Sequence, residues 1–308
     1  MNKENYVIGV DGGGTKTITA LANFEGEILK QIRSGPSNLR NLGIESAIDS
    51  IAFGISEAID GIKKENIAFV VVGLAAVDEE FKDKKEGIKK MLSEKTGIPG
   101  LKIGIVSDQL VAFKSGTDEE KGVVLISGTG AVCHGWWKGQ EAKTSGWGWL
   151  NDEGSGFWIG QRAFQAIFRA LDGRGKDTKI SDLIFKQFEV ANKEELMAKI
   201  YQNENLPRAI SLMSIAVDEA EQKGDKIAGE ILSSAAKELS ESAVCVIKKL
   251  DIEKENFPLV LVGKMFISKI VLEEAKKEVK KIAPHTEFIR PKQETVVGAI
   301  KLAIKKLG

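Results

Sequence analysis

The stretch VIGVDGGGTKTITALANF, residues 7–24, places three consecutive glycines between two apolar segments. The first segment is rich in β-branched residues and predicts a buried strand. After the glycines, apolar residues recur with a period of two, which predicts a second strand rather than a helix. A third strand is expected in EILKQIRSG, residues 27–35, after a turn at Glu25 and Gly26. The chain therefore opens with a β-meander whose first turn is rich in glycine.

The glycines fit neither of two well-known phosphate-binding motifs. Gly9 and Gly14 have the spacing of a P-loop, but Thr15 occupies the position that needs lysine. If a dinucleotide fingerprint starts at Gly12, Thr17 stands where the sixth-position glycine is needed. Both motifs also require a helix after the turn, and a strand is expected here.

A second stretch, GVVLISGTGAVCHGWWKGQ at residues 122–140, repeats this design. An apolar strand ends at Gly128, Thr129 and Gly130, and another strand follows. One such hairpin is common, so two unrelated hairpins are the simple alternative. Two of them about one domain apart, each opening a meander, favour a duplicated architecture.

Glycine turns expose backbone N–H groups that can bind anionic oxygens. Two such turns facing each other across a cleft would hold a polyphosphate from both sides. Thr15, Lys16 and Thr129 would add hydroxyl and ammonium donors. Asp11 ends the first strand and is expected to lie beside a hydrated Mg²⁺, because this cation prefers carboxylate and water oxygens.

Three segments carry a family resemblance: GVDGGGTKT at 9–17, VLISGTG at 124–130 and GWGWLNDEGSGFWIG at 146–160. In this order they resemble the N-acetylglucosamine kinase and BadF/BadG/BcrA/BcrD-type ATPase family of the actin/hexokinase superfamily. The match extends from Val7 to about Ala303. The resemblance implies an α/β, two-domain actin/hexokinase-like (ribonuclease H-like) fold with a nucleotide cleft between the domains.

The resemblance also implies that the first domain is discontinuous. An N-terminal α/β domain would comprise residues 1–112 plus 295–308, because the amphipathic helix at the C-terminus packs back on it. A larger C-terminal α/β domain would comprise residues 113–294 and would be mostly helical after its own meander. In the first domain, helices are expected over about 44–63 and 79–97.

By resemblance, the glycine turns are the phosphate-1 and phosphate-2 motifs, and PLVLVGKMF at residues 258–266 is the adenosine motif. That motif should end in a pair of glycines, but one glycine and a lysine stand here, which leaves the contacts to the base open. Asp11 is expected to hold Mg²⁺ through water. The residues expected to bind ATP are Asp11, Gly13, Gly14, Thr15, Lys16, Gly128, Thr129, Gly130, Gly263 and Lys264.

The acceptor side of the reaction is expected after the strand in LKIGIVSDQLVAF, residues 101–113. From spacing alone, Ser107 or Asp108 is an ordinary helix N-cap. By resemblance, Asp108 is the general base that deprotonates the sugar hydroxyl while the γ-phosphate is held in line. The two roles are compatible.

Further sugar contacts are implied only by the resemblance. Asn38 reads from the sequence as a cap or turn residue, and in the resembling kinases this asparagine hydrogen-bonds the sugar. Asp152 precedes a helix, whose dipole it would favour. By resemblance it reaches sugar hydroxyls, with Gly146 and Trp147 lining the pocket. A carboxylate suits that task because it can accept several hydrogen bonds.

The composition narrows the choice of partners. The 308 residues include 44 Lys and Arg and 44 Asp and Glu, so the net charge of zero gives no electrostatic reason to expect nucleic acid or membrane as a partner. There is no signal-peptide core and no apolar run of about 18 residues. We expect a cytoplasmic homodimer that binds a small-molecule sugar.

The leading hypothesis is ATP-dependent phosphorylation of a hexose or hexosamine, with N-acetylglucosamine first and glucose or glucosamine next. The alternative, from the same family, is an iron–sulfur ATPase that activates a 2-hydroxyacyl-CoA dehydratase or benzoyl-CoA reductase. That activity needs closely placed cysteines from each subunit, whereas Cys133 and Cys245 read as small core residues. A non-catalytic sugar sensor would be expected to lose the base or the glycine turns, and all of these are present.

Overall fold

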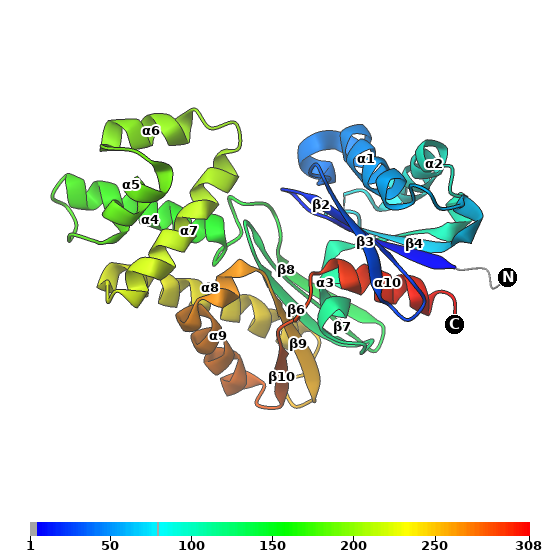
Figure 1. The fold of residues 1–308 in the computed structure, drawn as a ribbon. Coiled ribbons are helices and arrows are strands. Elements are labelled where there is room, and N and C mark those ends of the chain that lie inside the picture. Colours follow the sequence, from blue (N-terminus) through cyan, green and yellow to red (C-terminus); the bar gives the residue numbers. More distant parts are fainter. Residues whose placement is uncertain (1–4, 79) are drawn as a thin grey trace. The chain divides into compact units, whose positions relative to one another are not determined.

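The computed structural model describes residues 5–78 and 80–308, which divide into two compact units (Figure 1). Unit 1 comprises the residues up to Glu119 together with Arg290–Gly308, and unit 2 comprises Glu120–Ile289. The first boundary follows helix α3 (Asp108–Gly116), which packs on the C-terminal helix α10 (Val296–Lys305). Both domain boundaries expected from the sequence therefore lie inside unit 1.

Unit 1 is built on a five-stranded mixed sheet in the order β3-β2-β1-β4-β5. The central strand β1 pairs antiparallel with β2 and parallel with β4, which in turn pairs parallel with β5. Ile8 and Val10 of β1 are buried in one core and Val7 in another, so side chains on both faces of this strand are covered. The elements are β1 Tyr6–Gly12, β2 Thr17–Ala22, β3 Ile28–Ser34, α1 Leu39–Ala58, β4 Ile67–Leu74, α2 Lys85–Thr96 and β5 Ile103–Ser107, followed by α3 and, at the C-terminus, α10.

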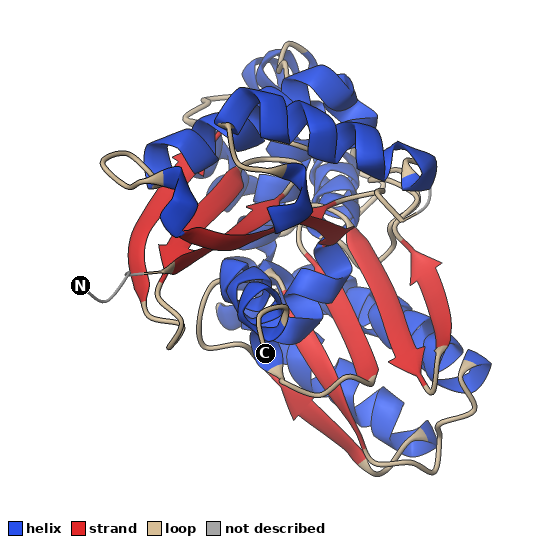
Figure 2. Cartoon of the chain, turned by 90° about the vertical axis from the view of Figure 1, so that its right-hand side faces the viewer, coloured by secondary structure: helices blue, strands red, loops and turns tan. Residues whose placement is uncertain are grey.

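Unit 2 repeats this topology. Its sheet has the order β10-β9-β6-β7-β8, with β6 in the centre, antiparallel to β7 and parallel to β9. The strands of both sheets are drawn in red in Figure 2. The predicted duplication and the predicted fold class are confirmed. The elements are β6 Gly122–Ser127, β7 Ala131–Trp137, β8 Gln140–Ser145, α4 Gly156–Leu171, α5 Ile180–Phe188, α6 Lys193–Tyr201, α7 Leu206–Gln222, α8 Lys226–Lys249, β9 Phe257–Val262, α9 Lys269–Ile282 and β10 Thr286–Ile289.

Two helices of unit 1 differ from the predicted ranges. Helix α1 starts earlier than predicted, at Leu39, and is kinked at Gly43, whose φ of 76° is not helical. It ends at Ala58 instead of reaching residue 63. Helix α2 was predicted to start at residue 79, which lies outside the described residues. It starts at Lys85, after a short 3₁₀ turn at Lys82–Lys84.

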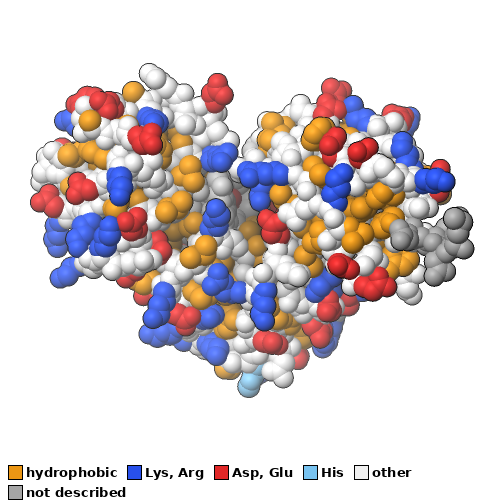
Figure 3. Space-filling view, in the orientation of Figure 1, with side chains coloured by type: hydrophobic (Ala, Val, Ile, Leu, Met, Phe, Trp, Pro, Cys, Tyr) orange, Lys and Arg blue, Asp and Glu red, His pale blue; other side chains and the backbone are white. Residues whose placement is uncertain are grey.

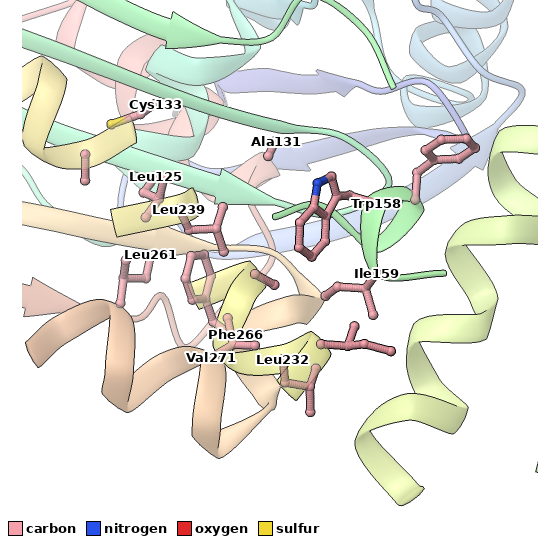
Figure 4. Close-up of a cluster of buried hydrophobic side chains, with 14 of the residues drawn as sticks. Leu125, Ala131, Cys133, Trp158, Ile159, Leu232, Leu239, Leu261, Phe266 and Val271 are labelled. Atoms are coloured by element: carbon pink, nitrogen blue, oxygen red, sulfur yellow. The ribbon is translucent and has the colours of Figure 1, made fainter. Parts of the chain in front are cut away.

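The core of unit 2 joins its sheet to the helices behind it. Figure 4 shows Leu125 and Cys133 of the sheet, Leu239 of α8, and Phe266 and Trp158 among the clustered side chains. Trp158 is buried, and the Arg162 guanidinium lies 3.5 Å from its ring centre.

Charged side chains of both signs are interspersed over the face drawn in Figure 3, consistent with the balanced composition. Among the described residues, no helix is both long and apolar enough to cross a membrane.

Candidate functional site

In unit 1, three parallel strands end at the same edge of the sheet. Gly12 of β1 pairs with Leu74 of β4, and Leu74 pairs with Ser107 of β5. Gly12 and Ser107 are therefore two strand spacings apart, about 10 Å. Because Asp11 directly precedes Gly12 and Asp108 directly follows Ser107, the sheet brings the two predicted carboxylates to one edge of this unit.

The glycine turn between β1 and β2 offers backbone donors. The Gly13 amide is already used, because it donates to Lys16 O at 3.1 Å within the turn. The amides of Gly14 and Thr15 donate no hydrogen bond to any described residue. The donors open to an anionic oxygen are thus those of Gly14 and Thr15.

This turn is fastened to the loop that follows β3. Thr17 Oγ1 lies 2.7 Å from both Gly35 O and Ser37 Oγ, and the Ser37 amide donates to Gly13 O at 3.0 Å. A Cβ on Gly12 would lie 2.6 Å from Ser37 Oγ, so this position requires glycine. Sequence analysis did not single out Ser37 for this role, because nothing in the local pattern pairs the loop with the turn.

Asn38 ends this loop and caps α1. Its side chain accepts hydrogen bonds from the amides of Arg40 at 3.0 Å and Asn41 at 3.3 Å, so the cap interpretation is confirmed. Its Nδ2 atom lies 3.9 Å from where a Cβ of Gly14 would be. Asn38 therefore lies beside the phosphate-1 turn, with its amide nitrogen nearest to that turn.

Asp108 is the first residue of α3. The cap of this helix is Ser107, whose hydroxyl accepts from the Leu110 amide at 3.3 Å. Asp108 Oδ1 accepts from the Gln109 amide at 3.0 Å. The helix dipole favours a carboxylate in the first turn of a helix. A general base must be in this charged form before it can accept a proton.

Asp11 is partly buried at the end of β1, and its Oδ2 atom accepts a hydrogen bond from the Thr295 hydroxyl. Burial raises the pKa of the Asp11 carboxyl above its ordinary value, and the Thr295 hydrogen bond and the Lys16 charge lower it again only in part. Lys16 Nζ lies 3.6 Å from the Glu294 carboxylate, in an exposed pair. Sequence analysis missed Thr295 and Glu294, whose partners are distant in the chain.

The oxygen ligand at this edge fits Mg²⁺, which keeps several waters, better than it fits a metal ion that is held by protein side chains alone. The described residues contain no cluster of three or more His, Cys, Asp or Glu side chains that could hold an ion. Mg²⁺ usually keeps several waters and is bound by one or two carboxylates together with phosphate oxygens. Asp11 offers one such carboxylate.

In unit 2, the turn between β6 and β7 rests on the start of α4. The Gly128 and Thr129 carbonyls accept from the amides of Gly156 at 2.8 Å and Phe157 at 3.2 Å. The amides of Thr129 and Gly130 donate to no described residue. The second turn thus also offers two backbone donors, and the N-terminus of a helix lies behind it.

Gly263 directly follows β9 and contacts this turn. Its φ is 111°, and a Cβ there would lie 2.0 Å from Ser127 O and 3.1 Å from Gly128 N. Lys264 follows in a short 3₁₀ helix. The predicted adenosine motif and the phosphate-2 turn are therefore in direct backbone contact.

Asp152 supports the loop that carries Gly146 and Trp147. Its Oδ1 atom accepts from the amides of Gly146 at 2.9 Å and Gly148 at 3.3 Å, and its Oδ2 atom lies 2.5 Å from where a Cβ of Gly130 would be. Burial raises the pKa of Asp152, and the backbone amides around it offset this rise only in part. With 6% of its surface exposed, this carboxylate binds the loop to the phosphate-2 turn, whereas Trp147 is 69% exposed.

Replacing Asp152 by alanine is expected to lower the free energy of unfolding by about 1–3 kcal/mol, because the partly buried amides of Gly146 and Gly148 lose their acceptor. Denaturant unfolding of the purified variant measures this loss. Asp172→Ala is the matched control. Among the described residues, its exposed carboxylate bonds to Arg174 alone, and water screens this pair, so its loss should change stability little. Equal stability of the Asp152 variant and the wild type would contradict the role of loop support.

The two cysteines lie in the interior of unit 2. Cys133 is buried in β7, where burial raises the pKa of its thiol well above the ordinary value. Cys245 is partly buried on α8. A buried thiol of this kind is a core residue and is poorly suited to hold a cluster shared between subunits.

This chain is similar to known proteins over nearly its whole length. The model of the BadF/BadG/BcrA/BcrD ATPase family matches residues 8–303. The N-acetylmuramic acid/N-acetylglucosamine kinase of Clostridium acetobutylicum is 30% identical over 303 residues, covering 97% of this chain and 98% of the relative. The N-acetyl-D-glucosamine kinase of Dictyostelium discoideum is 32% identical over 323 residues, covering 99% of each.

A solved structure extends the likeness in fold. It is a ROK family glucokinase from Streptomyces griseus in complex with glucose and AMPPNP, with a TM-score of 0.67 and 16% identity, covering 99% of this chain and 100% of that one. The resemblance read from the three sequence motifs is thus confirmed over nearly the whole chain. On the family match and the two relatives, this chain belongs to the BadF/BadG/BcrA/BcrD ATPase family.

Proposed function

We propose that this protein is an ATP-dependent sugar kinase that transfers the γ-phosphate to a hydroxyl of a hexosamine or hexose, with N-acetylglucosamine as its first substrate. The observation that carries the proposal is the pair of glycine turns, each at the end of the central strand of its sheet and each with two unused amides. The names of the two relatives that match almost end to end, both kinases of N-acetylglucosamine, support the choice of sugar.

Both turns would bind phosphate oxygens of ATP. In unit 1 the donors are the amides of Gly14 and Thr15, and the exposed Lys16 ammonium adds a positive charge. In unit 2 they are the amides of Thr129 and Gly130. Backbone donors that are fixed before the substrate arrives stabilise charge on the transferred phosphoryl group without reorganisation. The Lys16 pair with Glu294 is exposed and weak, so phosphate can replace the carboxylate.

Mg²⁺ would be held by Asp11 through water, and when bound it neutralises charge on the phosphate oxygens. Asp108 would accept the proton of the attacking sugar hydroxyl. Its position at the sheet edge that also carries Asp11 supports this role, as does its place in the first turn of α3.

The proposed sugar contacts are Asn38, Asp108, Gly146, Trp147 and Asp152. The Asn38 amide nitrogen beside Gly14 supports a contact next to the phosphate-1 turn. The exposed Trp147 ring offers an apolar surface, and sugar rings present apolar faces to such rings. For Asp152, the hydrogen bonds to the loop favour an indirect part, in which it holds Gly146 and Trp147 in place.

The iron–sulfur activator is the less supported alternative. Its cluster needs thiolates that two subunits can share, and the buried Cys133 thiol argues against this.

A substrate panel tests the proposal. ADP release is measured with Mg²⁺-ATP and each of N-acetylglucosamine, N-acetylmuramic acid, glucosamine and glucose. The expected result is sugar-dependent ADP release that is fastest with N-acetylglucosamine and is lost when Mg²⁺ is chelated. ATP hydrolysis that no sugar stimulates, in a protein that is brown when purified without oxygen, would instead support the iron–sulfur alternative. The homodimer and the cytoplasmic location stay predictions, and light scattering on the purified protein tests the first.

A further inference from the structure

Thr295 stands at the N-cap of α10 but does not cap it. Threonine is among the residues that helices prefer at this position, where a side-chain cap contributes about 1 kcal/mol. The Thr295 side chain makes no cap hydrogen bond. Its hydroxyl donates instead to Asp11 Oδ2, across 284 positions of the chain. The side chain is thus used for a contact to β1 instead of the contact its own helix would favour.

The start of α10 is held at this place by close packing. A Cβ on Gly9 of β1 would lie 2.8 Å from the backbone nitrogen of Ile300. A Cβ on Gly298 would lie 1.9 Å from Val111 O of α3. Because α10 touches both β1 and α3 through glycines, it has little freedom to slide. The Thr295 hydroxyl is therefore delivered to Asp11 by the packing of α10, and not by a flexible loop.

The contact leaves half of the Asp11 carboxylate available. Oδ2 accepts from Thr295, and no other hydrogen bond joins the Asp11 side chain to a described residue. When a hydrogen bond holds one oxygen of a carboxylate, the direction in which the other oxygen points is also fixed. This is the arrangement expected of a group that must present one oxygen to a hydrated cation, and oxygen ligands of metal ions are commonly oriented by a second hydrogen bond in this way.

We propose that Thr295 is a positioning residue for the nucleotide-bound Mg²⁺, which it serves by orienting Asp11. This inference rests on the proposed function, in which Asp11 holds the hydrated cation. Glu294 directly precedes Thr295, and its carboxylate contacts Lys16, which lies in the glycine turn between β1 and β2. Two consecutive residues before α10 thus reach both charged side chains of the phosphate-1 turn.

Calorimetric titration with ADP, with and without Mg²⁺, tests the proposal without turnover. In the wild type, Mg²⁺ is expected to strengthen ADP binding. In Thr295→Val this gain should fall by about tenfold, as expected for the loss of one hydrogen bond to a charged group. Thr295→Ser keeps the hydroxyl and should restore most of the gain. ADP affinity without Mg²⁺ should change little in either variant.

Thr96→Val is the matched control. Thr96 is a second threonine of unit 1. It is buried at the end of α2, and its hydroxyl donates to Leu92 O at 2.7 Å. This variant is expected to lose stability but to keep the wild-type gain from Mg²⁺. A merely structural role of Thr295 predicts that its valine variant behaves in the same way, and that result would overturn the inference. If Thr295→Val does not fold, Thr295→Ala removes the same hydroxyl with less bulk and carries the same expectation.

The wild-type titration distinguishes failure of the proposed function from failure of the role of Thr295. If the wild type binds no ADP, or binds it equally well with and without Mg²⁺, the proposed nucleotide site itself fails and this inference fails with it. If the wild type gains affinity from Mg²⁺ and Thr295→Val gains equally, only the role of Thr295 is refuted.

Discussion

Asp108→Asn is expected to lower kcat by about 10²–10⁴-fold, the usual contribution of a general base, while the KM values for sugar and ATP stay near those of the wild type. The substitution is nearly isosteric, and the amide oxygen can still accept from the Gln109 backbone amide, as Oδ1 does now at 3.0 Å. What it removes is the ability to take up the proton of the attacking hydroxyl. Steady-state kinetics with the sugar that the substrate panel identifies would measure the change.

The cap of the same helix provides the control for this variant. Ser107→Ala removes the hydroxyl that accepts from the Leu110 amide and should cost about 0.5–2 kcal/mol of stability, but it leaves the Asp108 carboxylate in place. Most of kcat should be retained. If the two variants lost activity equally, the effect would come from the start of α3, and the assignment of Asp108 as the base would be wrong.

Much of the fold could be predicted because it depends on the pattern of apolar and polar residues within short segments. The period-two segments after each glycine turn predicted β2 and β7, and the recurrence of the pattern predicted a duplicated architecture. The structure shows that the two sheets share their strand order. The return of α10 to the first domain was implied by the family resemblance. The amphipathic run at the C-terminus predicted the helix itself. These are contacts between neighbouring segments, or faces that any such segment must bury.

The local pattern did not reveal which polar groups meet across the fold. Nothing in the sequence indicates that the Oδ1 atom of Asp152 accepts from the amides of Gly146 and Gly148. Thr295 lies at an ordinary helix start and bonds to a residue at the other end of the chain. Both pairings depend on how loops and helices pack, and no residue spacing encodes that.

Glycines were a partial exception. Their number in the turns pointed to the phosphate motifs, but the reason for each one differs. Gly12 is needed because Ser37 leaves no room for a side chain, and Gly13 uses its amide inside the turn. The sequence predicted where backbone would be exposed, and only the structure separates the amides that are open from those that are used.

Gly263→Ala is expected to weaken ATP binding by about 10- to 100-fold, which corresponds to roughly 1.4–2.8 kcal/mol. At a φ of 111° an alanine is strained, a cost of about 1–3 kcal/mol. The added Cβ would also lie 2.0 Å from Ser127 O, so the backbone just before the phosphate-2 turn must move. The amides of Thr129 and Gly130 would then lose the positions in which they meet phosphate.

The ratio of two KM values distinguishes this effect from a general loss of folding. The KM for ATP should rise by the stated factor. The KM for sugar should change less, because the proposed contacts Asn38 and Asp108 belong to the other unit and the atoms nearest to a Cβ at Gly263 do not belong to the proposed contacts in unit 2. Gly229→Ala is the matched control in unit 2. Its Cβ would meet only Glu221 Cγ, at 4.0 Å, and α8 should gain about 0.5–1 kcal/mol from losing a glycine. A Gly263 variant with the ATP KM of this control would show that the phosphate-2 turn tolerates displacement, and its amides could not then be the donors that hold the nucleotide.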